Sequence, residues 1–170
     1  MLSFRNSAIR FISISKFSLN QSIRMITTEV KDDSSLNGYP YRLTWSSHTV
    51  GWLPSPDANP SKFRENIEFT NDLHEVLKQN CHTDPEMIEQ ADREGEGWGH
   101  IIDKRKKLFI EGRIPEADDI FGSVKFEQGK PVEGSYQPSG THRLYTLTGS
   151  FSLPEYYHKP LQEYLMNKNK

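Results

Sequence analysis

The strongest constraint on the fold is a run of alternating side chains near the C-terminus. Between residues 145 and 153, apolar residues and small polar residues occupy alternating positions. Period-two alternation indicates a β-strand with one buried face, and one-faced strands are typical of antiparallel sheets. We therefore expect the apolar members to be buried and the polar members to be more exposed. The apolar members are Tyr145, Leu147, Phe151 and Leu153, and the polar members are Thr146, Thr148, Ser150 and Ser152.

Several shorter segments have the composition or the alternation of strands. Each is bounded by turn-forming residues, and Gln128-Gly129 is typical of a hairpin turn. By contrast, Gly95, Gly97 and Gly99 predict a flexible loop, with Trp98 as its anchor. The predicted strands cover residues 41–45, 50–53, 100–103, 108–114 and 120–126.

Helix signals occupy the middle and the end of the chain. Thr70–Asp72 offers an N-cap for a first helix, whose apolar residues follow at helical spacing. Asp84 and Pro85 are a strong start signal for a second helix, which should end at Gly95. A last helix is predicted to begin near Pro160. The apolar residues expected to pack inward are Leu73, Val76 and Leu77 in the first helix, Met87, Ile88 and Ala91 in the second, and Leu161, Tyr164 and Leu165 in the last.

These elements predict an α+β fold, with helices packed on one face of a mostly antiparallel sheet. We expect a single domain over residues 39–170, preceded by a flexible, polar lead-in over residues 27–38.

The first 26 residues have the composition of a mitochondrial targeting presequence. They contain four basic residues and six serines but no acidic residue, and the first acid is Glu29. Arg10 and Lys16 interrupt the apolar residues, which excludes both a secretory signal and a transmembrane helix. We therefore predict import into the mitochondrion, with the matrix as the destination.

Charge and cysteine content exclude two further classes. Without the presequence, 17 of the 21 basic residues remain against 23 acidic residues, a net charge of −6. An acidic domain is a poor candidate for nonspecific nucleic-acid binding, which needs a basic face. A single cysteine, Cys81, cannot form a disulfide within the chain.

The best candidate site is the polar loop from Tyr136 to Arg143. Loops on a rigid sheet are where binding sites usually lie, and this one brings together several hydrogen-bonding groups. His142 and Arg143 are suited to bind a carboxylate or a phosphate through charge-assisted hydrogen bonds. Asp118 and Asp119 could add an acid/base pair if they lie in a tight loop, although capping a turn before the strand at Ile120 is the simpler interpretation. The candidate ligand-binding residues are Tyr136, Thr141, His142, Arg143, Asp118 and Asp119.

Other motifs are weaker candidates for a functional site. Cys81 and His82, with His74 or His100, have no spacing diagnostic of a metal site. The basic run over residues 104–107 is typical of a solvated hairpin tip, but it could also contact a partner. No cofactor-binding motif is present, and we expect no cofactor or metal.

Three segments carry a resemblance to a known family. HTVGWL (residues 48–53), EGRIPEADDIFGSV (111–124) and YQPSGTHR (136–143) resemble a family of small fungal mitochondrial proteins of unassigned function. The resemblance implies a lineage and brings no catalytic residues. VGWL and the later Gly97-Trp98 pair are also similar to the domain that precedes the catalytic domain of some Nudix hydrolases. The Nudix box is absent, so diphosphate hydrolysis is not implied.

The leading hypothesis is a mitochondrial accessory domain that binds a protein partner or a small anionic ligand. One alternative is a small enzyme that acts on an anionic metabolite through His142 and Arg143, with Asp118 or Asp119. Another is an assembly or ribosome-associated factor that uses the basic run over residues 104–107. A concave pocket where the Tyr136–Arg143 loop meets Asp118 and Asp119 would favour the enzyme, whereas an exposed apolar patch would favour a scaffold.

Overall fold

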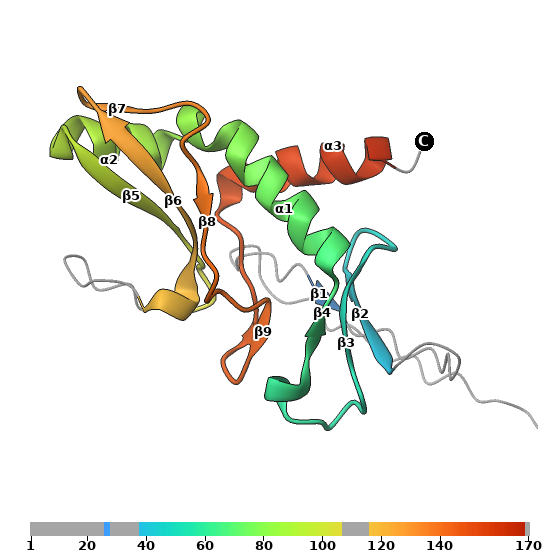
Figure 1. Cartoon of the computed structure of the whole chain (residues 1–170). Helices are drawn as coiled ribbons and strands as arrows, with labels where there is room; N and C mark the ends of the chain where they lie inside the picture. Colours follow the sequence, from blue (N-terminus) through green and yellow to red (C-terminus); the bar gives the residue numbers. More distant parts are fainter. Residues whose placement is uncertain (1–25, 28–37, 107–115, 169–170) are drawn as a thin grey trace, which may run out of the picture.

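A computed structural model describes residues 26–27, 38–106 and 116–168 (Figure 1). The presequence up to residue 25, most of the lead-in, and the strand predicted over residues 108–114 lie outside the described residues. The described part has an α+β fold, in which helices contact several small antiparallel sheets. This confirms the expected fold class, with the strands divided among separate sheets.

The first sheet has the order β1-β2-β3-β4 and is antiparallel throughout. Tyr41 pairs with Gly51 at its centre, and the Ser46 backbone N–H donates to the Leu43 carbonyl at the turn between β2 and β3. Tyr41 and Leu43 are buried, as the alternation predicts, and Val50 and Leu53 are buried in the next strand. The strands are β1 (Ile26–Thr27), β2 (Tyr39–Leu43), β3 (Thr49–Leu53) and β4 (Arg64–Glu65).

The second sheet is built on β6, which pairs with β5, β7 and β8. Gln128 and Gly129 connect β6 to β7 with φ angles of 51° and 73°. Positive φ at both central residues is the geometry of a type I′ turn, so the predicted hairpin turn is confirmed. The strands are β5 (Gly97–Ile102), β6 (Ile120–Glu127), β7 (Lys130–Pro131) and β8 (Gln137–Pro138).

The glycine-rich segment is a strand from Gly97 onward, so the prediction of a loop over residues 95–99 was wrong for most of its length. Gly99 pairs with Val124, and a Cβ at Gly99 would lie 2.1 Å from the ring of Phe126. Glycine is therefore needed here because an aromatic ring covers the backbone. Trp98 points away from this contact and is 42% exposed, so it is not the expected anchor.

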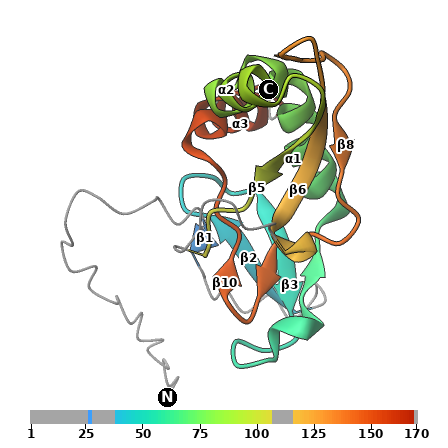
Figure 2. The same cartoon turned by 90° about the vertical axis from the view of Figure 1, so that its left-hand side faces the viewer.

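The helices lie towards one end of the molecule (Figure 2). Helix α1 begins at Ile67 with Asn66 as its cap, because the Asn66 side chain accepts from the Glu68 N–H. The cap predicted at Thr70–Asp72 was therefore wrong by about one turn. Asp72 lies inside the helix, where its carboxylate pairs with Lys168. The helices are α1 (Ile67–Asn80), α2 (Pro85–Glu94) and α3 (His158–Lys168).

Helix α2 starts and ends where the sequence predicts. Asp84 accepts from the Glu86 N–H, and Gly95 ends the helix with a φ of 75°. Met87 and Ala91 are buried, but Ile88 is 45% exposed, contrary to expectation. Ile88 directly follows Met87, and successive helical residues are separated by about 100° around the axis, so the narrow buried stripe excludes it.

The described residues also form short 3-10 helices: η1 (Pro60–Lys62), η2 (Cys81–Thr83), η3 (Ala117–Asp119) and η4 (Glu155–Tyr157). Helix α3 follows η4 directly, so Pro160 lies in the first turn of α3, where its missing N–H costs no helical hydrogen bond. Leu161 and Leu165 are buried and Tyr164 is partly buried, as expected.

The alternating run over residues 145–153 begins with a tight hairpin and does not form one long strand. Strands β9 (Tyr145–Thr146) and β10 (Gly149–Ser150) pair with each other, and Leu147 and Thr148 form the turn. The Thr148 N–H donates to the Thr146 hydroxyl, and Gly149 has a φ of 107°. Leu147 is consequently 85% exposed, so its predicted burial was wrong, whereas Phe151 is 1% exposed, as predicted.

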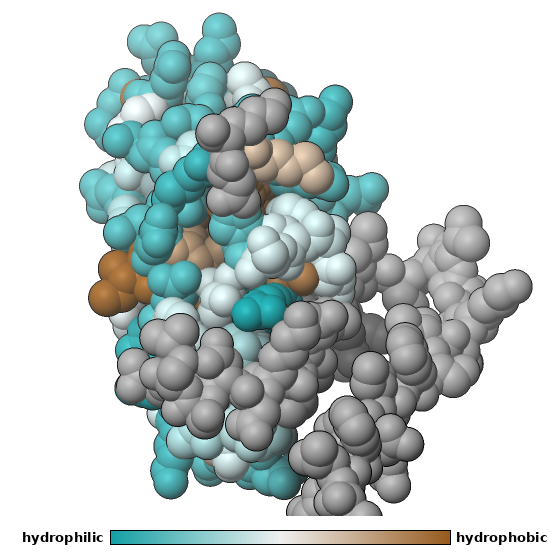
Figure 3. Space-filling model, turned by 90° about the vertical axis from the view of Figure 1, so that its right-hand side faces the viewer, coloured by the Kyte–Doolittle hydropathy of each residue, from teal (hydrophilic) through white to brown (hydrophobic). Residues whose placement is uncertain are grey.

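One apolar core joins α1, α3 and β6. Its largest fully buried side chains include Phe121, Phe126, Phe151 and Tyr157. The face shown in Figure 3 is mostly hydrophilic, with apolar side chains in separate spots. None of the helices in the described ranges is long and apolar enough to cross a membrane.

Candidate functional site

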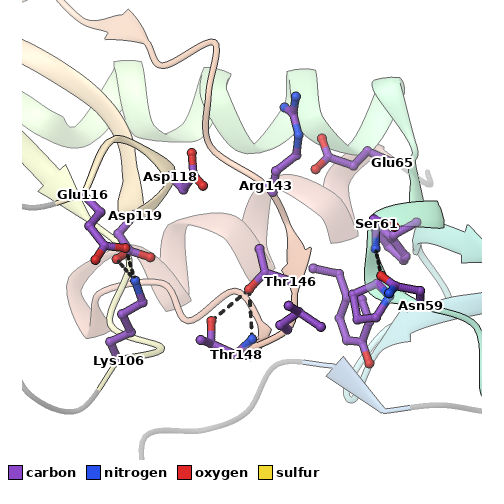
Figure 4. Close-up of a pocket in the computed structure, with 14 residues that line it drawn as sticks. Asn59, Ser61, Glu65, Lys106, Glu116, Asp118, Asp119, Arg143, Thr146 and Thr148 are labelled. Atoms are coloured by element: carbon purple, nitrogen blue, oxygen red, sulfur yellow. Dashed lines mark hydrogen bonds and ion pairs between the residues drawn. The ribbon is translucent and has the colours of Figure 1, made fainter.

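A cavity of about 460 Å³ opens where three segments meet: the η1–β4 segment, the η3 helix and the β9–β10 hairpin (Figure 4). We call it the cleft. Arg143, Asp118 and Asp119 all line it, so three of the six predicted site residues do converge. Glu65, Lys106 and Glu116 supply the other charges of the wall.

One side of the cleft is an ion-pair cluster around Lys106. Its ammonium lies 2.5 Å from the Glu116 carboxylate and 2.8 Å from the Asp119 carboxylate. These hydrogen bonds from Lys106, first to Asp119 and then to Glu116, raise the pKa of the lysine. Asp119 is therefore occupied by a structural contact, although it lines the cleft.

Asp118 differs from its neighbour because it lies on another side of the short η3 helix. Its side chain is exposed and lines the cleft. Within the described part of the chain, the Asp118 carboxylate makes no ion pair or hydrogen bond. It is a carboxylate available to a ligand.

Arg143 extends from the start of the hairpin between Asp118 and Glu65 in the view of Figure 4. Its guanidinium donates to the His142 carbonyl at 3.1 Å, and the Glu65 carboxylate accepts from the Leu144 N–H at 2.8 Å. Among the described residues, Arg143 forms no ion pair, with Asp118, Asp119 and Glu133 included.

The opposite wall of the cleft is aromatic. The rings of Phe63 and Tyr145 both line the cavity, with centroids 5.3 Å apart, and Tyr41 packs behind them at 5.6 Å and 5.1 Å. Burial, with Tyr145 adding to it, raises the pKa of Tyr41 to about 12, so its hydroxyl stays neutral. Leu147 at the hairpin tip extends this apolar wall outward.

The predicted loop from Tyr136 to Arg143 does not act as one unit. Tyr136 is buried, where its hydroxyl bonds to the His74 ring at 2.8 Å and donates to the Phe121 carbonyl at 3.2 Å. Burial raises the pKa of Tyr136. Thr141 is exposed, and its hydroxyl donates to the Ala117 carbonyl at 2.9 Å. Neither side chain lines the cleft.

His142 also points inward, into a buried ionic network. Its Nε2 lies 2.9 Å from the Asp103 carboxylate, and its ring stacks on Phe121 with centroids 4.2 Å apart. Because His142 and Arg143 point to opposite sides of the backbone, their side chains cannot both bind one ligand. The prediction that these two side chains bind the same ligand is therefore wrong.

Arg105 completes the network and was missed by sequence reasoning. Its side chain is 2% exposed, and its Nε donates to the Asp103 carboxylate at 2.9 Å. The guanidinium also donates to the Arg143 and Gly149 carbonyls and to the Thr146 hydroxyl. The sequence feature that could have indicated a buried ion pair is Asp103, an acid that directly precedes the basic run and lies two residues before Arg105.

The basic run matches the predicted solvated tip only in part, because Lys104 and Lys106 are exposed whereas the Arg105 side chain is not. Lys104 pairs with Glu86, Arg105 is buried, and Lys106 binds Asp119 and Glu116. Lys107 lies outside the described residues.

Phe63 and Glu65 line the cleft but were not among the predicted site residues, and no local motif marks either residue.

The candidate metal residues are dispersed. The Cys81 thiol is buried, which raises its pKa to about 11, and it makes a weak contact with the Lys78 carbonyl. His74 bonds to Tyr136 and His100 bonds to Ser123. In the ranges that the structure describes, no group of three His, Cys, Asp or Glu side chains is placed to hold a metal ion.

Comparison of the chain with models of known protein families, with curated proteins and with solved structures finds no match. The resemblance to small fungal mitochondrial proteins therefore stays a prediction.

Proposed function

We propose that this chain is an accessory domain that binds a small molecule in the cleft between the η1–β4 segment and the β9–β10 hairpin. The observation that carries the proposal is the pair Asp118 and Arg143. Both line one cavity, and neither forms an ion pair within the described residues. Charged side chains that line one cavity without pairing with each other are suited to orient a ligand. The cavity volume of about 460 Å³ lies in the range of small-molecule sites.

The surface supports a small ligand over a large protein partner. Among the described residues, the large apolar side chains that are exposed belong to different elements: Ile67, Ile88, Trp98, Leu147 and Met166. Apolar residues scattered singly are ordinary on a protein surface, whereas a docking face is contiguous.

The two alternatives gain less support. An enzyme that used His142 beside Arg143 would need both in the cleft, but His142 is buried against Asp103. An assembly factor that used the basic run would need its charges free, but those of Lys104, Arg105 and Lys106 are paired. Binding is therefore a better proposal than catalysis or docking through this run.

We place this binding domain in the mitochondrial matrix, on the strength of the acid-free, basic composition of residues 1–26. The single buried thiol fits a reducing compartment.

Binding can be tested by screening a small-molecule fragment library against the full isotope-labelled chain by NMR. We expect the amide shifts caused by fragments to concentrate in Tyr145–Thr148 and Glu116–Asp119. Tyr145→Ala should remove these shifts, whereas Trp98→Ala, a matched change of an exposed aromatic outside the cleft, should leave them. Fragments that bind only elsewhere, or equally well to Tyr145→Ala, would refute the proposed function.

A further inference from the structure

We propose, on the basis of the binding function above, that the ligand is an amphipathic organic cation: a protonated amine attached to an aromatic or aliphatic body. The first observation is the charge of the cleft wall. Four carboxylates line it, from Glu65, Glu116, Asp118 and Asp119, against two cations, from Lys106 and Arg143. A cleft lined mainly by one sign of charge concentrates ions of the opposite sign.

The second observation is which carboxylate is available. Lys106 is shared by Glu116 and Asp119, and Glu65 accepts the Leu144 N–H. Asp118 is the carboxylate without such a contact in the described ranges. An ammonium group bound to it would form charge-assisted hydrogen bonds, which are shorter and stronger than neutral ones.

The third observation is the apolar wall. Phe63 and Tyr145 present aromatic surface to the same cavity, and Leu147 adds an aliphatic side chain that is otherwise 85% exposed. Apolar atoms of a ligand would cover this surface, and aromatic faces attract a nearby cation. A ligand that combines an amine with an apolar body matches both walls.

Arg143 alone favours an anion, which is the ligand class that the sequence predicts. An anion bound to Arg143 would also meet the field of Glu65 and Asp118, which lie on either side of it in Figure 4. Its single favourable contact would be opposed by at least two like charges. The excess of carboxylates therefore favours the cation, and the anion becomes the competing outcome.

The test uses three compounds that share one apolar body: 4-phenylbutylamine, 4-phenylbutyrate and 4-phenylbutanol. Binding of each to the full chain at pH 7 is measured by NMR titration. We expect the amine to bind most tightly, with shifts in Tyr145–Thr148, and its affinity to fall as salt is raised. Asp118→Asn should weaken amine binding about two- to fivefold, because exposed charge pairs are weak. Asp92→Asn, a matched change of an exposed acid on α2, should not alter it.

The outcomes separate this inference from the proposed function. Tighter binding of 4-phenylbutyrate at the cleft, lost in Arg143→Gln, would overturn the cation and leave a binding domain for anions. Equal binding of the amine and the alcohol, unchanged by Asp118→Asn, would also overturn the cation alone. If none of the three compounds shifts the cleft amides and the fragment screen also leaves them unshifted, the proposed function itself fails.

Discussion

Removing the Arg105 guanidinium should destabilise the fold more than its place in a basic run suggests. The side chain is 2% exposed, and its partner Asp103 is fully buried. In Arg105→Met the volume stays similar, but Asp103 keeps its charge in a site with little water. Breaking a buried ion pair in this way costs about 3–5 kcal/mol in the free energy of unfolding, because the remaining carboxylate loses its charged partner and keeps only hydrogen bonds such as that with His142.

The cost should be large relative to the whole stability, because domains are stabilised by only about 5–15 kcal/mol. Urea denaturation followed by tryptophan fluorescence measures it, and Tm should fall by about 10 °C or more. Arg105→Lys should be intermediate, because lysine keeps the charge but lacks the planar fork that reaches Asp103 and two carbonyls.

Lys104→Met is the matched control. Lys104 is 42% exposed and pairs with Glu86 at the surface, so its loss should cost less than about 1 kcal/mol. The double variant Arg105→Met, Asp103→Asn should lose less than the sum of the single losses, since it removes both charges. Equal small losses for Arg105→Met and Lys104→Met would refute the argument that Arg105 balances a buried charge.

Three further predictions follow from burial, titration and composition. Phe151→Ala should cost about 3–5 kcal/mol because the ring is buried, whereas Leu147→Ala should change stability by less than about 0.5 kcal/mol; a comparable loss in both would refute the hairpin assignment. Burial raises the pKa of Asp103, but hydrogen bonds from His142 and Arg105 outweigh it, so the folded pKa lies below the ordinary value. Its contribution to stability is therefore present above about pH 4 and is lost as the pH falls below that value, and urea titrations between pH 5 and 3 should show a shallower decline for Asp103→Asn. Residues 1–26 fused to a fluorescent protein should carry it into mitochondria, and a reporter that stays in the cytosol would contradict the prediction.

The sequence by itself determined the elements whose signals are local. The Asp84 cap, the Gly95 stop and the Gln128-Gly129 turn each depend on backbone preferences within a few residues, and the structure confirms all three. Period-two alternation likewise identified β2 and β6, and together with the helix signals the strand patterns indicated the α+β class. The same alternation was misleading at Leu147, because two residues can form a turn without interrupting the pattern.

Only the tertiary structure decided which polar groups face the core and which face the cleft. His142 and Arg143 are adjacent in the sequence, yet one binds Asp103, 39 positions away, and the other lines the cavity. Arg105 is buried because Asp103 and the hairpin carbonyls compensate its charge, and the neighbouring sequence contains Asp103 but not those carbonyls, which lie about 40 positions away. Burial of a charge depends on groups brought together by folding, which a local pattern does not contain.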